Sequence, residues 1–320
     1  MRDMPIGPTA AMSPLAPFLE DAGFVMLDGG LSTQLERLGA DLGGELWTSR
    51  VLLERPELVL RAHTDFLSAG ADIIATSTYQ SSIAGFMRAG LTRSRAADLM
   101  REAVSIAIQA REDFWAGTRR NGRIKPLVAA SLGPYGACLH DGSEYHGNYA
   151  VEEHVLAEFH HQRIALLEQA GADLFAFETI PSLLEAEVIL AVLESFPGIR
   201  AWISFCGRDG QRVAHGERFA ECVARASESP QILAVGVNCT APSNIPSLLA
   251  SVENPSAPLA VYPNSGEHWD AVAGEWRGDA CAEMDVVGWH TLGARLIGGC
   301  CRTAAEDIRR MREELGNALS

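Results

Sequence analysis

Three cysteines are the residues of this chain whose types and setting best suit chemistry. Cys300 and Cys301 stand side by side in "RLIGGCCRT", and Cys239 ends the stretch "AVGVNC". Adjacent cysteines make strained disulfides with each other, because a disulfide requires a specific geometry. Zinc prefers soft sulfur ligands, and a site with three protein ligands keeps a fourth position open. A lone cysteine is usually a small buried hydrophobe, and a pair can also serve redox chemistry, so the fold must decide.

The elements that must position these cysteines are eight short apolar runs that alternate with longer helical patterns. The runs predict strands at Phe24–Leu27, Ile73–Ala75, Leu127–Ala130, Leu174–Phe177, Ala201–Phe205, Ile232–Val237, Leu259–Tyr262 and Arg295–Ile297. Apolar residues three and four apart predict helices at Val155–Ala170, Leu183–Phe196 and Phe219–Ser227. Eight such alternations predict an α/β protein, a single (β/α)8 TIM barrel. A doubly wound open sheet is the alternative, but "DGGLSTQLERLG" lacks the glycine spacing of a dinucleotide-binding turn.

In a parallel barrel, the carboxyl ends of all strands meet at one face, where active sites lie. The residues expected at that face are Asp28, Thr78, Tyr79, Ser131, Glu178, Cys206, Asn238, Cys239, Asn264, Cys300 and Cys301. We therefore expect Cys239, Cys300 and Cys301 to converge on one Zn²⁺ and to leave one position open. Gly298 and Gly299 are expected to permit the unusual backbone that adjacent ligands need.

The other cysteines and the histidines are interpreted as structural or surface residues. Cys206 ends a strand, but its motif "SFCGRDG" holds no second ligand. His63 is expected to pack between helices, and His160 and His161 in "EFHHQR" are expected on a helix surface. His-Glu-x-x-His and Cys-x-x-Cys motifs are absent from the sequence, so the three-cysteine set is the metal site that the sequence predicts.

Composition excludes several classes of function. The chain has 320 residues and a net charge of −15, which argues against a nucleic-acid surface. An apolar run of membrane-spanning length is absent, so no membrane segment is expected. The first residues carry prolines where a signal peptide needs an apolar core, so we expect a flexible tail over 1–20 and one barrel domain over 21–320. Seven cysteines without a signal peptide predict reduced thiols and a cytoplasmic location.

Motifs along nearly the whole chain resemble one family. They are "LDGGLSTQLERLG", "LWTSRVLLERPELV", "AGADIIATSTYQSSIAGF", "SLGPYGACLHDGSEYHGNY", "AGADLFAFETIPSLLEAE", "AVGVNCTAP", "VYPNSGEHWDA" and "GARLIGGCCRT". The chain resembles the homocysteine S-methyltransferases, which are zinc-dependent enzymes that make methionine from homocysteine. It looks most like the branch that uses S-methylmethionine or S-adenosylmethionine as methyl donor. The resemblance runs from about Asp21 to about Met311.

The resemblance implies a role for the strand-end residues. Cys239, Cys300 and Cys301 would hold Zn²⁺, with the homocysteine sulfur as fourth ligand and no catalytic side chain beyond the metal site. Glu178 would receive the homocysteine amino group, and Asp28 would lie near the substrate. Capping of the following helix is the alternative role for Asp28. A buried acid without a partner is costly, which favours a functional role for Glu178.

Further positions are implied for the substrate and the donor. Trp47 and Thr48 match a loop that contacts the amino acid or the donor, Asn264 matches an amide near the metal, and Tyr79 matches an aromatic wall. A sulfonium donor is a cation, so aromatic faces and carboxylates would bind it. Trp47, Tyr79, Trp269 and Glu144 are the candidates for this role.

Alternative functions stay open at this point. The same scaffold could use betaine, a methylfolate–cobalamin partner or a selenol acceptor. A zinc-storage or thiol-redox protein is an alternative from another class, but storage would not need Asp28, Glu178 and Asn264 at the same face. The preferred donor, the oligomeric state and the role of residues 264–285 as a loop over the site are left open by the sequence.

Overall fold

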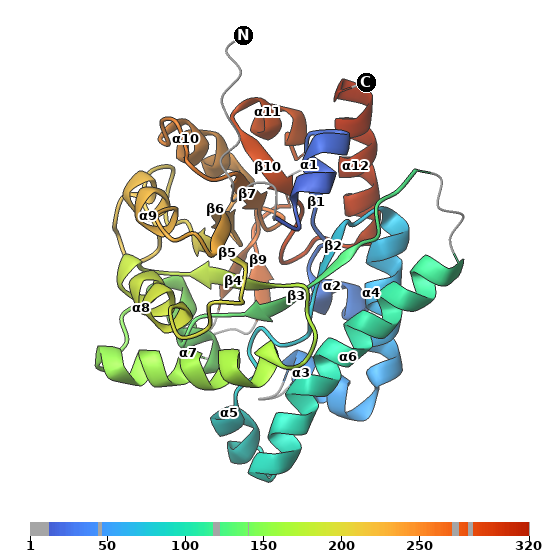
Figure 1. Ribbon diagram of the computed structural model, residues 1–320, viewed down its shortest axis with the longest axis vertical. Helices are drawn as coiled ribbons and strands as arrows, with labels where there is room; N and C mark the ends of the chain where they lie inside the picture. The colour runs from blue at the N-terminus through green and yellow to red at the C-terminus, as the bar shows by residue number, and fades with distance from the viewer. Residues whose placement is uncertain are drawn as a thin grey trace.

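The computed structural model describes residues 13–43, 47–117, 122–139, 141–270, 275–280 and 284–319. Within them, eight parallel strands form one sheet in the order β1-β10-β7-β6-β5-β4-β3-β2 (Figure 1). A parallel bridge between Leu27 and Ile73 joins β1 to β2 and closes the ring. The strands are β1 (Val25–Met26), β2 (Ile73–Ala75), β3 (Leu127–Leu132), β4 (Leu174–Ile180), β5 (Ala201–Cys206), β6 (Ile232–Asn238), β7 (Leu259–Tyr262) and β10 (Ala294–Ile297). The predicted (β/α)8 barrel is confirmed.

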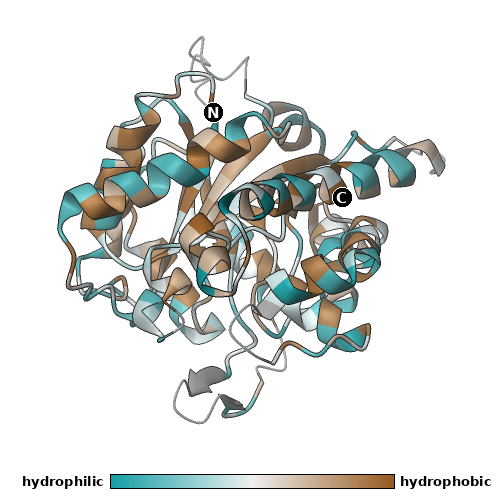
Figure 2. Ribbon diagram, turned by 90° about the horizontal axis from the view of Figure 1, so that it is seen from below, coloured by the Kyte–Doolittle hydropathy of each residue, from teal (hydrophilic) through white to brown (hydrophobic). Residues whose placement is uncertain are grey.

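Helices surround this ring and bury their apolar sides against it. They are α1 (Ala16–Ala22), α2 (Leu31–Arg37), α3 (Trp47–Glu54), α4 (Pro56–Ala69), α5 (Ile83–Arg88), α6 (Arg93–Gly117), α7 (Glu153–Glu168), α8 (Leu183–Leu193), α9 (Phe219–Ala226), α10 (Ile245–Ala250), α11 (Val286–Thr291) and α12 (Ala305–Leu319). Figure 2 shows hydrophobic strands at the centre and helices with both hydrophilic and hydrophobic surfaces. Within the described ranges, no helix is both long and apolar enough to cross a membrane.

Local sequence sets the boundaries of these helices. α4 begins at Pro56, where a missing N–H costs nothing, and it ends before Gly70, whose φ of 112° suits glycine. The Ser182 side chain accepts a hydrogen bond from the backbone N–H of Glu185 and so caps α8. The start of α8 at Leu183 agrees with the helix that the sequence predicts there.

The amino-terminal end of the barrel is closed by the first described residues. Leu15 and Phe18 are buried and pack with Val25, Ile73 and Leu174, which lie at or near the starts of their strands. The expected boundary between tail and barrel at residue 20 therefore needs a correction, because it falls inside α1. The apolar side chains of α1 cover the barrel interior at this end. Residues 1–12 of the expected tail lie outside the described part of the chain.

The recurring "AGAD" before a strand has a structural role at the same end of the barrel. Asp72 Oδ2 accepts a hydrogen bond of 2.9 Å from the Met26 N–H, and Asp173 Oδ2 accepts one of 2.7 Å from the Val128 N–H. Each aspartate thus ties the strand that follows it to the neighbouring strand. Arg312 pairs with Asp72 and Arg111 pairs with Asp173, so both acids are neutralised.

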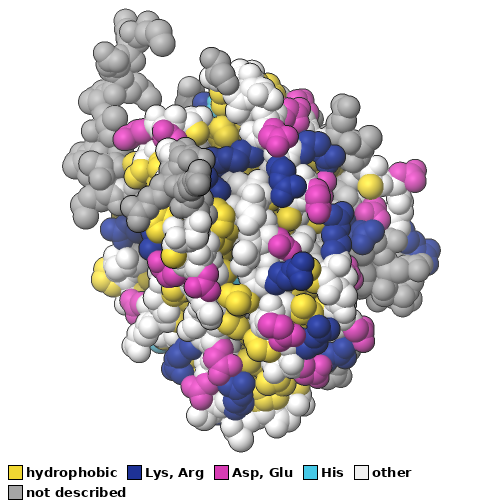
Figure 3. Space-filling view, turned by 90° about the vertical axis from the view of Figure 1, so that its right-hand side faces the viewer, with side chains coloured by type: hydrophobic (Ala, Val, Ile, Leu, Met, Phe, Trp, Pro, Cys, Tyr) yellow, Lys and Arg dark blue, Asp and Glu magenta, His cyan; other side chains and the backbone are white. Residues whose placement is uncertain are grey.

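The long connection after β7 contains a short antiparallel pair that the sequence did not predict. The pair consists of β8 (His268–Asp270) and β9 (Glu275–Arg277), with Trp269 opposite Trp276. The side chain of Trp269, a candidate for donor binding, lies outside the described part. On the face in Figure 3, acidic and basic side chains are interspersed.

Candidate metal and substrate site

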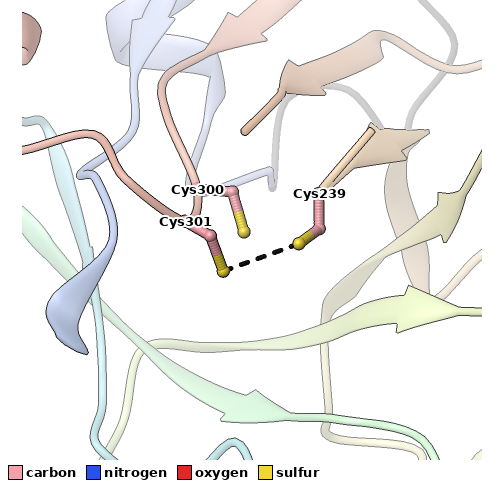
Figure 4. Close-up of side chains that lie close together, drawn as sticks. All are labelled: Cys239, Cys300 and Cys301. Atoms are coloured by element: carbon pink, nitrogen blue, oxygen red, sulfur yellow. Dashed lines mark hydrogen bonds between the residues drawn. The ribbon is translucent and has the colours of Figure 1, made fainter. Parts of the chain in front are cut away.

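Three cysteine sulfurs meet at the carboxyl end of the barrel. Cys239 follows β6, and Cys300 and Cys301 follow β10, with β7 lying between those strands. Their Sγ atoms all lie within 4.8 Å of one another, and those of Cys239 and Cys301 are 3.6 Å apart (Figure 4). Zinc–sulfur bonds of about 2.3 Å in a tetrahedron place sulfurs roughly 3.8 Å apart. The predicted convergence of the three cysteines is confirmed, and their spacing fits one metal ion.

The backbone that presents the cysteines is held by neighbouring strand ends. The Cys239 N–H donates to Tyr262 O at 3.1 Å, and the Cys300 N–H donates to Pro263 O at 2.8 Å. Cys239 has a φ of 46°, which is unusual for a residue with a side chain. The two acceptors are the last residue of β7 and the residue after it, so the end of β7 fixes the two halves of the cluster relative to each other.

The two glycines before Cys300 act through close packing. A Cβ on Gly299 would lie 2.1 Å from Thr303 Oγ1, and one on Gly298 would lie 2.6 Å from Leu27 Cβ. Neither glycine has a positive φ, so the expectation of an unusual glycine backbone is wrong. The left-handed residue of this turn is Arg302, with a φ of 66°. Glycine is needed because the turn lies against β1 and against its own next residues.

The three thiols interact strongly with one another. Hydrogen bonds from Cys300 and Cys301 lower the pKa of Cys239, and donating them raises the pKa of both partners. One thiolate is therefore stabilised by two neutral thiols. Three thiolates at this spacing require a cation between them, because like charges in a buried site repel. This donor set fits a soft metal ion.

Two carboxyl groups lie at the same end of the barrel without a basic partner. Asp28 follows β1, is buried, and accepts a hydrogen bond of 2.7 Å from the Ala75 N–H. Its pKa is raised well above the ordinary value by burial, with a further contribution from Glu178. Burial raises the pKa of Glu178 to about 7, although Ser131 Oγ donates to its Oε1 at 2.5 Å. Within the described chain, neither acid forms an ion pair, so both can still bind a cation.

The alternative role of Asp28 as a helix cap is wrong. α2 begins at Leu31, its N-cap residue is Gly30, and it has no side-chain cap. The space at Gly30 is taken by Cys300, whose carbonyl oxygen would lie 2.5 Å from an added Cβ. The chain after β1 thus lies against the cysteine turn and leaves Asp28 at the barrel mouth.

The remaining predicted site residues have more varied settings. Asn264 is buried, but its Oδ1 accepts from the Gly266 N–H at 2.9 Å and so serves its own turn. Tyr79 is partly buried, and its ring packs against Gly133, where an added Cβ would lie 2.7 Å from the ring. Thr48 is partly buried in the first turn of α3. The Trp47 side chain lies outside the described part, so the roles of Trp47 and Thr48 stay predictions.

Two residues at the sulfur cluster had no assigned role in the sequence. Asn238 is buried, and its Nδ2 lies 2.8 Å from Thr179 Oγ1 and 3.8 Å from Cys300 Sγ. Its position directly before Cys239 at a strand end was the available signal. The Tyr145 hydroxyl lies 3.8 Å from Cys239 Sγ. Tyr145 ends the short helix η3 (Ser143–Tyr145), whose sequence carries no periodicity that could indicate the contact. Both are donors that can orient metal-bound sulfur.

A buried polar network supports the loops of the barrel mouth. Arg163, on α7, is buried and donates to the carbonyl oxygens of Gly133 at 2.6 Å and Tyr79 at 2.7 Å. His160 is fully buried and lies 2.9 Å from Glu185 Oε1, so its expected place on the helix surface is wrong. The sequence pattern did not predict the burial of His160 because α7 buries polar as well as apolar residues.

Comparison with known proteins decides the family. The family model described as homocysteine S-methyltransferase matches residues 25–315. The chain belongs to this family. Homocysteine S-methyltransferase YbgG of Bacillus subtilis is 47% identical over 305 residues, which cover 94% of this chain and 97% of that protein. The homocysteine S-methyltransferase of Escherichia coli is 41% identical over 305 residues, which cover 94% of this chain and 98% of that protein. The prediction of a methyltransferase is confirmed.

A solved structure from the family extends this likeness to the fold. The metallated form of the E. coli homocysteine methyltransferase MmuM has a TM-score of 0.83 and 38% identity, with 94% of this chain and 100% of that chain covered. That crystal form carries a metal. In the present chain, the three converging cysteines are the group suited to one.

Proposed function

We propose that this protein transfers a methyl group from a sulfonium donor, S-methylmethionine or S-adenosylmethionine, to homocysteine. Zn²⁺ held by Cys239, Cys300 and Cys301 would be the cofactor. The observation that carries this proposal is the convergence of three sulfurs within 4.8 Å at the mouth of a barrel. Family membership supports the acceptor, and the metallated relative supports a metal at such a site.

The ligand set favours zinc among the metals. All three ligand atoms are sulfur, which suits Zn²⁺ better than Mg²⁺ or Ca²⁺. When bound, Zn²⁺ supplies the positive charge that keeps the cysteines and the substrate sulfur deprotonated at neutral pH. Asn238 and Tyr145 would then donate to the cysteine sulfurs and hold them in place.

The acids would bind the ammonium group of homocysteine. Asp28 lies close enough to Glu178 for that carboxyl group to contribute, after burial, to its raised pKa, and neither acid has a basic partner in the described chain. Bringing an ammonium group between them would favour their ionised forms and offset the cost of burial. Ser131 holds Glu178 in position through its hydroxyl. Two acids around one cation would orient the amino acid relative to the sulfurs.

The transfer step needs no proton acceptor in the protein. The homocysteine thiolate attacks the methyl carbon of the donor, so a sulfur–carbon bond forms while the donor's sulfur–methyl bond breaks. The breaking bond's electron pair stays on the donor sulfur, which becomes a neutral thioether. Because the thiol proton has already left to solvent, the residues at the mouth act by binding and orienting the two substrates.

Methionine formation tests this proposal. Zinc-loaded protein is given homocysteine with S-methylmethionine, S-adenosylmethionine or betaine in separate reactions, and metal content is measured by mass spectrometry. We expect turnover with a sulfonium donor and a loss of more than about 100-fold in Cys301→Ala, together with the metal. Cys222→Ala is the matched control, since Cys222 is buried on α9 outside the cluster.

The alternatives give different results in the same experiment when a selenol acceptor is tested beside homocysteine. If only betaine supports turnover, betaine and not a sulfonium is the donor. If a selenol supports turnover and a thiol does not, the selenol and not homocysteine is the acceptor. Bound zinc with no turnover by any pair would support storage or redox function. Full activity in Cys301→Ala would reject the thiolate–metal site itself.

A further inference from the structure

Glu144 is a buried carboxyl group that the proposed chemistry has not yet used. It is 9% exposed, and within the described chain its Oε2 is buried without any hydrogen-bond partner. A buried carboxylate oxygen without a donor is costly, and such groups in native proteins usually have a functional reason. The question is which ligand would approach this oxygen.

The backbone of Glu144 is fixed at the barrel mouth. Glu144 lies in the short helix η3 (Ser143–Tyr145), which packs closely on η2 (Gly136–Cys138). A Cβ on Gly136 would lie 2.5 Å from the Glu144 nitrogen, so no larger residue fits there. The next residue, Tyr145, places its hydroxyl 3.8 Å from Cys239 Sγ. Glu144 is thus carried by the segment that reaches the sulfur cluster.

The surroundings of Glu144 are aromatic and acidic. After burial, its negative charge is a further cause of the raised pKa of three groups near the sulfur cluster, Tyr79, Tyr145 and Cys206. Burial, with a smaller contribution from Asp141, raises the pKa of Glu144 to about 7. No lysine or arginine of the described chain forms an ion pair with it. An aromatic wall with a carboxylate and without a basic group suits a cation that has no N–H to donate.

We propose that Glu144 recognises the positively charged sulfur of the methyl donor and thereby determines donor specificity. This inference rests on the proposed function. A sulfonium carries one positive charge before transfer, and the thioether that remains after transfer is neutral. Attraction to Glu144 therefore favours the donor over its demethylated product, which promotes product release. Since the charge is lost as the methyl group leaves, Glu144 acts on donor binding more than on the transfer step.

Donor kinetics with Glu144→Gln test the inference. The variant keeps the shape of the side chain and removes its charge. In zinc-loaded protein we expect KM for the sulfonium donor to rise about 10- to 100-fold at neutral pH, with kcat, homocysteine KM and metal content unchanged. Glu144→Asp, which keeps the charge, should recover part of the affinity. Glu152→Gln, an exposed acid at the start of α7, controls for the net charge.

Inhibition by methionine separates the sulfonium from the amino-acid end of the donor. At saturating homocysteine, methionine competes only for the donor subsite, and it lacks the charge on sulfur. We expect its inhibition constant to be the same in wild type and Glu144→Gln. If the inhibition constant of methionine and the KM of S-methylmethionine both rise to the same extent in Glu144→Gln, Glu144 binds the ammonium end of the donor. That result overturns the assignment.

Failure of this inference and failure of the proposed function look different. If wild-type protein turns over no sulfonium donor, the proposed function is wrong. If wild type is active and Glu144→Gln has an unchanged donor KM, only the role of Glu144 is rejected.

Discussion

The acids at the two ends of the barrel differ in whether a basic side chain pairs with them. At the amino end, Asp72 and Asp173 each accept a backbone N–H and each pair with an arginine. At the carboxyl end, Asp28, Glu178 and Glu144 have no basic partner in the described chain. The acids of the amino end are thus paired within the protein, whereas these three acids of the mouth are not, as our proposal of a cationic substrate there requires.

Burial by itself does not separate the two kinds of acid. Glu185 is fully buried near the mouth, yet it accepts from the Tyr135 N–H at 2.6 Å and from the Tyr149 hydroxyl at 3.0 Å. His160 Nε2 adds a third contact at 2.9 Å. Both of its oxygens are therefore in use. Among the described residues, Asp28, Glu178 and Glu144 differ from Glu185 in that no histidine, lysine or arginine pairs with them.

Glu185→Ala should have the largest effect on stability. It leaves several buried donors unpaired, so the free energy of unfolding should fall by about 3–5 kcal/mol. Urea unfolding of the purified protein measures the change. Glu187→Ala on the same helix is the control, because its ion pair with Arg225 is exposed and should matter by less than about 1 kcal/mol. Equal losses of unfolding free energy in the two variants would contradict the difference between a buried acid with several hydrogen bonds and an exposed one.

Glu178→Gln should instead affect binding. We expect homocysteine affinity to fall by about 10- to 100-fold, since a charged partner of the ammonium group is lost. The melting temperature should stay the same or rise, because a buried acid without a basic partner is removed. Calorimetric titration with homocysteine and a thermal melt measure both on one sample. A lower melting temperature with unchanged affinity would place Glu178 with the structural acids.

His63 tests whether a missing partner alone indicates function. It is fully buried on α4 and has no hydrogen-bond partner within the described chain. Burial lowers its pKa from 6.5 to about 4. The unfolded chain therefore binds more protons between these values, and stability falls as the pH decreases through this window.

The size of that effect can be measured by comparison with His63→Leu. Between about pH 7.5 and about pH 5, His63 should contribute a loss of about 2 kcal/mol of unfolding free energy in wild type. Urea unfolding at both pH values should show a smaller decrease in the variant. Activity at neutral pH should be retained in His63→Leu. A large loss of activity with normal stability would give this helix a functional role.

Asp72→Asn should have the smallest effect. The amide keeps an acceptor for the Met26 N–H but loses the charge that pairs with the partly exposed Arg312. We expect a decrease of about 1 kcal/mol in unfolding free energy, and unchanged kcat and KM for both substrates. Asp173→Asn, at the same position before β4, should cause a similar decrease in unfolding free energy and leave the kinetic constants unchanged. Altered KM in either variant would contradict the division of the barrel into a structural end and a binding end.

The sequence by itself determined the barrel and the sulfur cluster. A buried parallel strand is a continuous apolar run, so the eight runs could be read directly, and β2 and β7 have the predicted limits. Once the strands are parallel, their carboxyl ends meet, which brings Cys239 together with Cys300 and Cys301. These inferences need only local patterns and one topological rule.

Only the tertiary structure decided which polar groups are satisfied. Asp72 and Arg312 are 240 residues apart, and Tyr145 meets Cys239 across 94 residues. The packing of α1 under the barrel and the burial of His160 likewise depend on distant partners. A buried polar group needs whichever donor the folded chain brings to it, and no local periodicity records that partner. The division between acids that have a basic partner and acids that have none is therefore a property of the folded barrel.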